Sequence, residues 1–318
     1  MQKGFSLIVG NVWTGAIPRF NSSKLRVLAA TLLIFFTVPS CVDAADQFFD
    51  SNGVKIRYVT AGTGQPVVLI HGWMSDSSMW GADEKGNTRL NADGIKGFQF
   101  IALDCRGHGK SDKPKDSKDY GPEMAADVVR LLDHLKIKKA HLVGYSSGAF
   151  IAGKVAATHP ARVLSVVYAG QAPIIAETMK PSDFSETDLF SKAVDENDLG
   201  AYLIAIMPSH IPKPTEEQAK AYSNYLYGGK DVGAFAAAGR SFKELKISEK
   251  KLRKYKGPIL FIHGSNESDH VKNRVASVRN ILERGEVYVV EGGDHTTTLA
   301  KPDFLTALRK FLNSGKSK

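Results

Sequence analysis

Cysteine is scarce in this 318-residue sequence, which contains only Cys41 and Cys105. Neither belongs to a Cys-x-x-Cys pair, and no His-Glu-x-x-His sequence occurs. These absences argue against a structural zinc site and against a zinc peptidase. An internal disulfide is not expected either, because a chain of this length buries enough apolar surface to fold without cross-links. We therefore predict no metal site and a structural role for Cys105.

Motifs that bind phosphate groups are also missing. There is no Gly-x-x-x-x-Gly-Lys-[Ser/Thr] sequence, and no Gly-x-Gly-x-x-Gly follows an expected strand. Nucleotide-binding loops need such glycines so that backbone amides can approach the phosphates. We therefore predict no cofactor. The formal net charge of +9 comes from lysines without interleaved aromatic residues, which indicates a solvated surface and no nucleic-acid partner.

A hydrophobic run long enough to span a membrane is absent as well. The apolar segment at residues 27–38 is short, and Lys24 and Arg26 precede it. A basic start, a short apolar core and small residues at a cleavage position are typical of an export signal. We predict that residues 1–44 are a signal peptide and that the protein is exported, either to a periplasm or to the medium. The alternative is a lipoprotein anchored through Cys41, so that the membrane is contacted only through the leader or that lipid.

Strands and helices are expected to alternate along most of the remaining chain. Short apolar runs bounded by glycine or proline indicate strands, and apolar residues at intervals of three and four indicate amphipathic helices. Strands are expected at residues 48–49, 54–61, 67–70, 98–103, 140–143, 163–169, 258–262 and 287–290. Helices are expected through residues 79–80 and at residues 120–135, 147–159, 271–282 and 303–312. This alternation predicts an α/β fold, with a parallel sheet covered by helices on both faces.

Residues 171–256 interrupt the alternation. This segment contains apolar stretches separated by prolines, and it follows the carboxyl end of an expected strand. We predict a helical cap over a site at that edge of the sheet. The predicted organisation is a signal peptide (1–44), a first core segment (45–170), the cap (171–256) and a second core segment (257–318).

The sequence Gly144-Tyr145-Ser146-Ser147-Gly148 directly follows one of the expected strands. A serine on a sharp strand-to-helix turn takes a positive φ, which crowds the residues two before and two after it. Glycine fits at both places because it lacks the Cβ atom that would collide. The motif alone also fits an ordinary Gly/Ser loop. Its place between an expected strand and an expected helix favours a nucleophilic serine.

Three further motifs lie at expected strand ends. They are His71-Gly72-Trp73, Asp104-x-Arg106-Gly107-x-Gly109-x-Ser111 and Gly293-Asp294-His295. Together with the serine motif, and in this order, they resemble the α/β-hydrolase superfamily. The resemblance covers essentially all of residues 45–318. It implies a mostly parallel eight-stranded sheet with a helical cap inserted after the sixth strand, and a serine-histidine-acid triad.

The resemblance assigns the triad to the serine motif and the two last strand ends. Ser146 is the predicted nucleophile, and His295 is the base that takes its proton. In similar enzymes the acid lies three residues beyond the glycine that ends the preceding strand, which places Glu267 after Gly264. A slightly longer turn would bring Asp269 into the same position, so both acids are candidates.

Several neighbouring motif residues are assigned supporting roles by the same resemblance. The backbone amides of Trp73 and Ser147 are the predicted donors to the oxyanion. The side chain of His71 is expected to brace its loop. Asp104 and Arg106 are expected to brace the end of a strand and are not placed in the catalytic set.

Histidines and carboxylates gather near the carboxyl terminus. These residue types could bind a metal, but the hydrolase pattern already accounts for their positions, and Asp294 is expected to have a solvated role in its loop. The residues concerned are His263, Asp269, His270, Asp294 and His295. We predict no metal at this cluster.

The predicted function is an exported serine hydrolase that cleaves a carboxylic ester or a related acyl substrate through an acyl-enzyme. Alternatives with the same triad are a C–C bond, lactone or amide hydrolase and a perhydrolase; a binding protein without catalysis is a third class. Serine at position 146 disfavours dehalogenase and epoxide-hydrolase chemistry, for which similar proteins carry aspartate. The substrate is expected to be a small molecule. Aromatic residues of the cap would suit an apolar substrate group or would pack the cap helices together: Phe184, Phe190, Tyr202, Tyr222, Tyr225, Tyr227 and Phe235.

Overall fold

The computed structural model describes residues 46–81, 90, 95–207 and 212–314. The predicted signal peptide at residues 1–44 and the alternative lipid attachment site at Cys41 lie outside the described residues. Within the described part, no helix combines the length and the apolar character needed to cross a bilayer.

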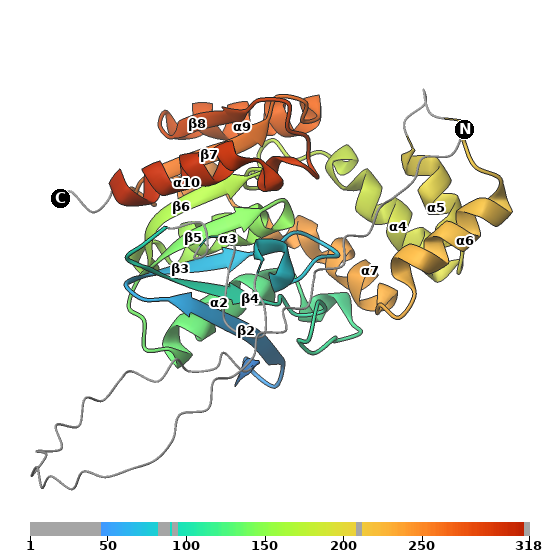
Figure 1. The fold of residues 1–318 in the computed structure, drawn as a ribbon, viewed down its shortest axis with the longest axis horizontal. Helices are drawn as coiled ribbons and strands as arrows, with labels where there is room; N and C mark the ends of the chain where they lie inside the picture. The colour runs from blue at the N-terminus through green and yellow to red at the C-terminus, as the bar shows by residue number, and fades with distance from the viewer. Residues whose placement is uncertain (1–45, 82–89, 91–94, 208–211, 315–318) are drawn as a thin grey trace, which may run out of the picture. The chain divides into compact units, whose positions relative to one another are not determined.

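Among the described residues, eight strands form one sheet (Figure 1). Their order across the sheet is β1-β2-β4-β3-β5-β6-β7-β8. Strand β2 pairs antiparallel with β1 and with β4, and all other neighbours are parallel. The prediction of a mostly parallel eight-stranded sheet is therefore confirmed. The strands are β1 (Gln47–Asp50), β2 (Lys55–Gly62), β3 (Gln65–Ile70), β4 (Phe98–Leu103), β5 (Ala140–Tyr145), β6 (Val163–Ala169), β7 (Ile259–Gly264) and β8 (Glu286–Val290).

Helices cover both faces of this sheet. The α-helices are α2 (Pro122–His134), α3 (Ser147–Thr158), α4 (Ser185–Asp195), α5 (Leu199–Ile206), α6 (Glu216–Tyr227), α7 (Val232–Ser241), α8 (Glu249–Leu252), α9 (Asp269–Leu282) and α10 (Pro302–Ser314). Short 3₁₀ helices are η1 (Ser77–Trp80), η2 (Ser117–Asp119), η3 (Pro160–Arg162), η4 (Pro181–Phe184), η5 (Phe242–Leu245) and η6 (Thr298–Ala300).

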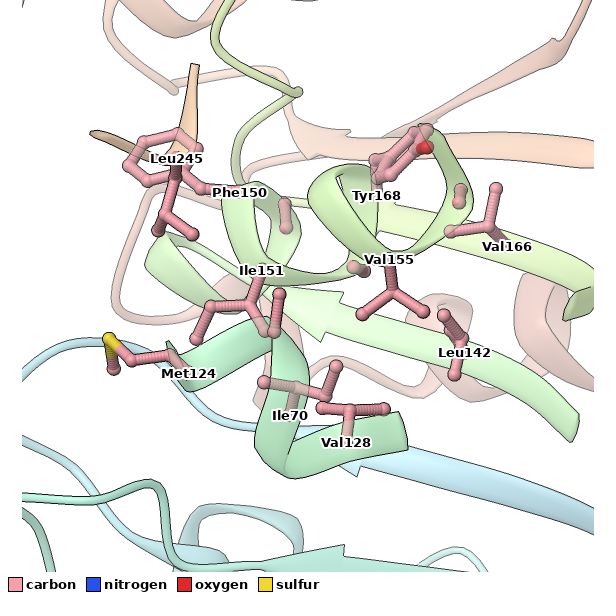
Figure 2. Packing of buried hydrophobic residues seen from close by; sticks show 14 of the residues in the cluster. Ile70, Met124, Val128, Leu142, Phe150, Ile151, Val155, Val166, Tyr168 and Leu245 are labelled. Carbon is pink, nitrogen blue, oxygen red and sulfur yellow. The ribbon is translucent and has the colours of Figure 1, made fainter. Parts of the chain in front are cut away.

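The two faces of the sheet build two separate cores, because side chains of a strand point alternately to opposite sides. On β5, Leu142 belongs to the core that contains helices α2, α3 and α9, whereas Val143 belongs to the core that contains α10. Figure 2 shows the first core, where Ile151 and Val155 of α3 lie near Ile70 of β3 and Leu142. These four side chains, and Val143 in the other core, are essentially inaccessible to solvent, and burial of each contributes about 1.5–3 kcal/mol.

A helical insertion, defined here as residues 171–256, separates β6 from β7 and contains helices α4 to α8. Helices α4, α5 and α7 enclose a small apolar core of their own around Phe190, Tyr202 and Phe235. Side-chain oxygens cap four of the helices α4 to α8: Asp198 caps α5, Thr215 caps α6, Asp231 caps α7 and Ser248 caps α8. The helical character expected for this segment is thus observed.

Candidate active site

Ser146 lies on the turn between β5 and α3. Its φ of 54° and ψ of −121° place it in a region that side chains with a Cβ atom seldom adopt. The amide of Ser146 donates to the carbonyl of Ala169 at 2.8 Å, which fixes the turn against β6. A Cβ atom on Gly144 would lie 2.1 Å from the carbonyl oxygen of Gly148, so this close approach requires glycine. The sharp turn presents the Ser146 hydroxyl beyond the end of the sheet.

His295 follows β8 and faces this serine. The Nε2 atom of His295 lies 2.9 Å from the Ser146 hydroxyl oxygen. The backbone of the histidine is held by Tyr145, whose hydroxyl donates to the carbonyl oxygen of His295 at 2.8 Å. The residue that precedes the serine thus positions the loop of the histidine.

Glu267 supplies the third group. Its Oε2 atom lies 2.9 Å from Nδ1 of His295, and its Oε1 atom accepts the amide of Ser268 at 3.0 Å. The end of β7 and the loop after β8 approach so closely that a Cβ atom on Gly264 would lie 2.0 Å from the carbonyl oxygen of Gly293. Glu267 is 5% exposed, so its carboxylate is largely shielded from water.

Asp269, the other candidate acid, lies outside this arrangement. Helix α9 begins at Asp269 because the side chain of Ser268 caps the helix by accepting the amide of Val271 at 3.4 Å. The Asp269 side chain is 93% exposed and lies 4.0 Å from Lys272. The structure therefore brings together Ser146, His295 and Glu267, and it leaves Asp269 in solvent.

The charge on Glu267 shapes the proton affinity of His295. Burial alone lowers the pKa of the imidazole, but the hydrogen bond to Glu267 and the negative charge of that carboxylate outweigh burial. The pKa of His295 is therefore raised above its ordinary value. With Nδ1–H donating to the carboxylate, Nε2 is the free acceptor that faces Ser146.

The loop that carries Trp73 lies directly beside the serine. A Cβ atom on Gly72 would be 3.2 Å from Cβ and 3.8 Å from Oγ of Ser146. The indole Nε1–H of Trp73 donates to the carbonyl of Phe235 in α7 at 2.9 Å, which ties this loop to the helical insertion. Ser147 begins helix α3 immediately after the serine. Both predicted amide donors thus belong to segments that flank Ser146.

His71 braces this loop from within the core. Its Nε2 atom accepts the amide of Cys105 at 2.9 Å, so Nδ1 carries the proton and donates to the carbonyl of Gly72 at 2.7 Å. Burial lowers the pKa of His71, which keeps the ring neutral. Burial, with a smaller effect from His71, also lowers the pKa of the neighbouring His108 to about 3. The thiol of Cys105 is buried, and burial raises its pKa.

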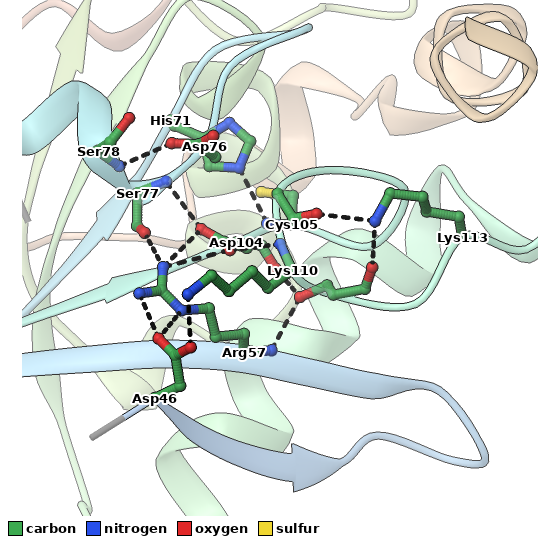
Figure 3. A network of polar contacts seen from close by, with 12 residues as sticks. Asp46, Arg57, His71, Asp76, Ser77, Ser78, Asp104, Cys105, Lys110 and Lys113 are labelled. Atoms are coloured by element: carbon green, nitrogen blue, oxygen red, sulfur yellow. Dashed lines mark hydrogen bonds and ion pairs between the residues drawn. The ribbon is translucent and has the colours of Figure 1, made fainter. Parts of the chain in front are cut away.

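Asp104 and Arg106 have separate partners at the end of β4. Asp104 accepts the amides of Ser77 and Lys110, each at 2.8 Å, and lies 3.3 Å from the guanidinium of Arg57 (Figure 3). Arg106 Nε donates to Asp127 at 2.7 Å. The sequence analysis did not identify Arg57, because its burial and its partner Asp104 follow from the pairing of distant segments.

A cavity of about 330 Å³ opens at this site. Its lining includes the three residues Ser146, Glu267 and His295, together with residues of the loop after β3, helix α3, helix α9 and the helical insertion. The remaining lining residues are Trp73, Ser147, Phe150, Gln171, Asp183, Glu186, Thr187, Phe242, Ser268, His270 and Val271. The cavity matches the lower end of the range that small-molecule sites occupy.

The insertion lines the cavity mainly with polar side chains. Seven of its aromatic residues are candidates for binding an apolar substrate group. Phe184, Phe190, Tyr202 and Phe235 are buried in the packing of the insertion and core, and Tyr227 packs against them. Tyr222 and Tyr225 stack on each other at the surface. None of these seven lines the cavity within the described residues. Of the two readings, the structure supports packing.

An ion pair joins the insertion to the core at one wall of the cavity. Arg274 of α9 lies 3.1 Å from Asp183 of η4, and its guanidinium also contacts the Gln171 amide oxygen at 3.4 Å. The same guanidinium lies 5.5 Å from the ring centre of Phe150, within cation–π range. These contacts fix the polar wall beside Ser146, and they could not be predicted from the sequence because they join distant segments.

The carboxyl-terminal cluster considered for a metal is dispersed. Within the described ranges, no three histidine, cysteine, aspartate or glutamate side chains are placed to hold a metal ion. Asp294 instead accepts the amides of Thr296 and Thr297 at 2.9 and 2.8 Å. The hydroxyls of both threonines also donate to it. These hydrogen bonds, the one from the Thr297 hydroxyl most strongly, lower the pKa of Asp294. Asp294 is half-buried, and its hydrogen bonds hold the loop that follows β8.

Comparisons with known proteins bear on this geometry. A family model described as "alpha/beta hydrolase fold" matches residues 65–302. The dihydrolipoyllysine-residue acetyltransferase component of the acetoin cleaving system of Cupriavidus necator is 38% identical over 125 residues, which cover 39% of this chain and 31% of that protein. In the short alignments, the chain spans only 31% to 43% of the length of the curated relatives that it matches.

A longer alignment joins the chain to a hydrolase. The 2-hydroxy-6-oxo-6-(2'-aminophenyl)hexa-2,4-dienoic acid hydrolase of Metapseudomonas resinovorans is 27% identical over 284 residues, covering 84% of this chain and 91% of that one. Among solved structures, a carboxylesterase study of Nitrososphaera gargenis gives a TM-score of 0.69 at 22% identity, covering 85% of this chain and 99% of the other. At that identity the structural match supports the fold.

Proposed function

Because the chain belongs to the alpha/beta hydrolase fold family, we propose that it is a serine hydrolase that cleaves a carboxylic ester or a related acyl substrate. The observation that carries this proposal is the continuous relay from Ser146 through His295 to Glu267, with 2.9 Å at each step. Such a relay converts a weakly nucleophilic hydroxyl into a nucleophile at neutral pH.

In the proposed reaction, Ser146 Oγ attacks the substrate carbonyl while its proton passes to Nε2 of His295. Glu267 stabilises the imidazolium that forms. Collapse of the tetrahedral intermediate transfers that proton to the leaving alcohol and leaves an acyl-enzyme on Ser146. Water then attacks the ester carbonyl, with His295 again as base, and releases the acid and the free serine.

The negative charge of the tetrahedral intermediate needs donors that are already in place. We assign this role to the backbone amides of Trp73 and Ser147. The contact of Gly72 with Ser146 and the start of helix α3 at Ser147 support the assignment. A helix amino terminus also favours negative charge at this position.

Two further expectations belong to the same proposal. The helical insertion acts as a cap, which the cavity lining by Asp183, Glu186 and Thr187 supports. The protein is exported by a signal peptide at residues 1–44, or it is anchored through Cys41; the basic and apolar leader supports this part.

Hydrolysis of a C–C bond, a lactone or an amide and perhydrolysis would use the same three residues, and one relative is named for hydrolysis of a dienoic acid. A binding protein without catalysis is less well supported, because an intact relay has no role in binding alone. Esters, lactones and amides should be tested as a panel on purified protein, with Ser146→Ala as the control. Hydrolysis of esters above the Ser146→Ala background supports the proposal, and no turnover of any panel member by the folded protein contradicts it.

A further inference from the structure

The lining of the catalytic cavity is unequally charged. It includes three carboxylates, those of Asp183, Glu186 and Glu267, and among the described residues no lysine or arginine lines it. The basic groups at its wall are the imidazoles of His270 and His295. A cavity with this composition attracts positive charge and repels a carboxylate.

Two of these carboxylates already have partners. Glu267 is hydrogen-bonded to His295 at 2.9 Å, and Asp183 pairs with Arg274 at 3.1 Å behind the wall. Glu186 lies at the exposed rim of the cavity and forms no ion pair with any described residue. Its charge is therefore the one left for a substrate to meet.

Glu186 is held in place by a buried tyrosine. The hydroxyl of Tyr202, which is 2% exposed, donates to Oε1 of Glu186 at 3.2 Å. This bond orients the carboxylate and leaves Oε2 without a protein partner among the described residues. The field of Glu186 also reaches the catalytic base: after burial, which lowers the pKa of His295, and Glu267, which raises it, Glu186 raises it further.

Three aromatic residues also belong to the wall. Trp73, Phe150 and Phe242 line the cavity, and the rings of Trp73 and Phe242 meet edge to face at 6.0 Å. Aromatic faces attract organic cations, and Arg274 already uses Phe150 in this way. One uncompensated carboxylate beside aromatic rings is the arrangement that suits an alkylammonium group.

We propose that Glu186 makes this site select acyl substrates that carry a positively charged amino or quaternary ammonium group over substrates of the same shape without charge. The inference rests on the proposed hydrolase function and names its substrate class. Because Glu186 is on the insertion and Ser146 on the core, the selecting charge and the nucleophile come from different parts of the chain.

Two esters of equal shape test the inference. Butyrylcholine carries a trimethylammonium group where 3,3-dimethylbutyl butyrate carries an uncharged tert-butyl group. The wild-type kcat/KM is expected to favour the choline ester by about fivefold or more, and Glu186→Gln should reduce that ratio by about fivefold. Asp188→Asn is the matched control, since Asp188 is exposed on the same helix, as Glu186 is, but does not line the cavity. Its ratio should equal that of the wild type.

A binding measurement separates this inference from the hydrolase proposal. Choline and 3,3-dimethylbutanol are titrated by NMR into Ser146→Ala and into the double variant with Glu186→Gln. Preference for choline in the first protein, reduced in the second, supports the cation site even if neither ester is turned over. Equal ester ratios in wild type and Glu186→Gln, or equal binding of the two alcohols, would overturn it. If the cation site is overturned but the uncharged ester is hydrolysed, the hydrolase proposal still holds.

Discussion

The Nε2 atom of His295 lies 2.9 Å from the hydroxyl oxygen of Ser146, although the two residues are 149 positions apart in the chain. They meet because β5 and β8 run parallel in one sheet, so the loops that follow them emerge at the same edge. Glu267 follows β7, which lies between β5 and β8 in the sheet. The sheet topology therefore determines which three side chains converge.

Replacing Glu267 by glutamine tests which carboxylate orients the histidine. An amide cannot stabilise the imidazolium by charge, so kcat is expected to fall by about 100- to 10,000-fold. Asp269→Asn changes a side chain that is 93% exposed, and kcat should change by less than about twofold. Steady-state kinetics with one chromogenic ester measures both. A larger loss in Asp269→Asn would contradict the assignment.

The pH dependence of kcat/KM reports the state of His295. The base must be neutral to accept the serine proton, so activity is lost as the pH falls through its pKa. Since Glu267 raises that pKa above the value of 6.5, the acid limb should have its midpoint above pH 6.5. In Glu267→Gln the midpoint should move to lower pH, because the raising charge is gone. An unshifted midpoint in the variant would show that another group controls this limb.

Gly72→Ala tests the contact between the oxyanion loop and the nucleophile. The added Cβ atom would lie 3.2 Å from Cβ of Ser146, so the loop or the serine must shift by a few tenths of an ångström. Such a shift should lower kcat by about 10- to 100-fold with the protein still folded. Gly233→Ala in α7 is the control, because its Cβ meets only Asp231 at 3.5 Å. Unchanged kcat in Gly72→Ala would contradict the placement of this loop.

Arg57→Met tests the buried brace at the end of β4. Removal of the guanidinium leaves Asp104, which is 1% exposed, without its cationic partner. The free energy of unfolding is expected to fall by about 3–5 kcal/mol. Lys118→Met removes a lysine from an exposed pair with Asp116 and should leave the urea midpoint unchanged. If both variants unfolded at the same urea concentration, the ion pair of Arg57 with Asp104 would not contribute to the stability of the fold.

Much of the fold and the strained turn at Ser146 could be predicted from local sequence. The run at 67–70 is apolar because β3 is covered on both faces, and the glycines at 144 and 148 reflect atoms that would otherwise collide. These signals act over a few residues, so periodicity and motif spacing reveal them.

Other features depend on contacts between distant segments. The role of Arg57 follows from its partner Asp104, 47 residues later, and Glu186 reaches the cavity only through the packing of the insertion. The choice between Glu267 and Asp269 depends on a more local signal. Serine is a helix-capping residue, so Ser268 indicates that α9 begins at Asp269. A side chain in that first turn of the helix points away from the histidine.

The central claim, that Ser146 is an activated nucleophile, is tested most directly by covalent labelling. The purified protein is treated with a fluorophosphonate, digested and analysed by mass spectrometry, with Ser146→Ala and heat-unfolded wild type in parallel. We predict one phosphonylated site, on the peptide that contains Ser146, in the folded wild-type protein alone. The claim would be contradicted if the folded wild-type protein stayed unlabelled, or if the Ser146→Ala variant were labelled to the same extent.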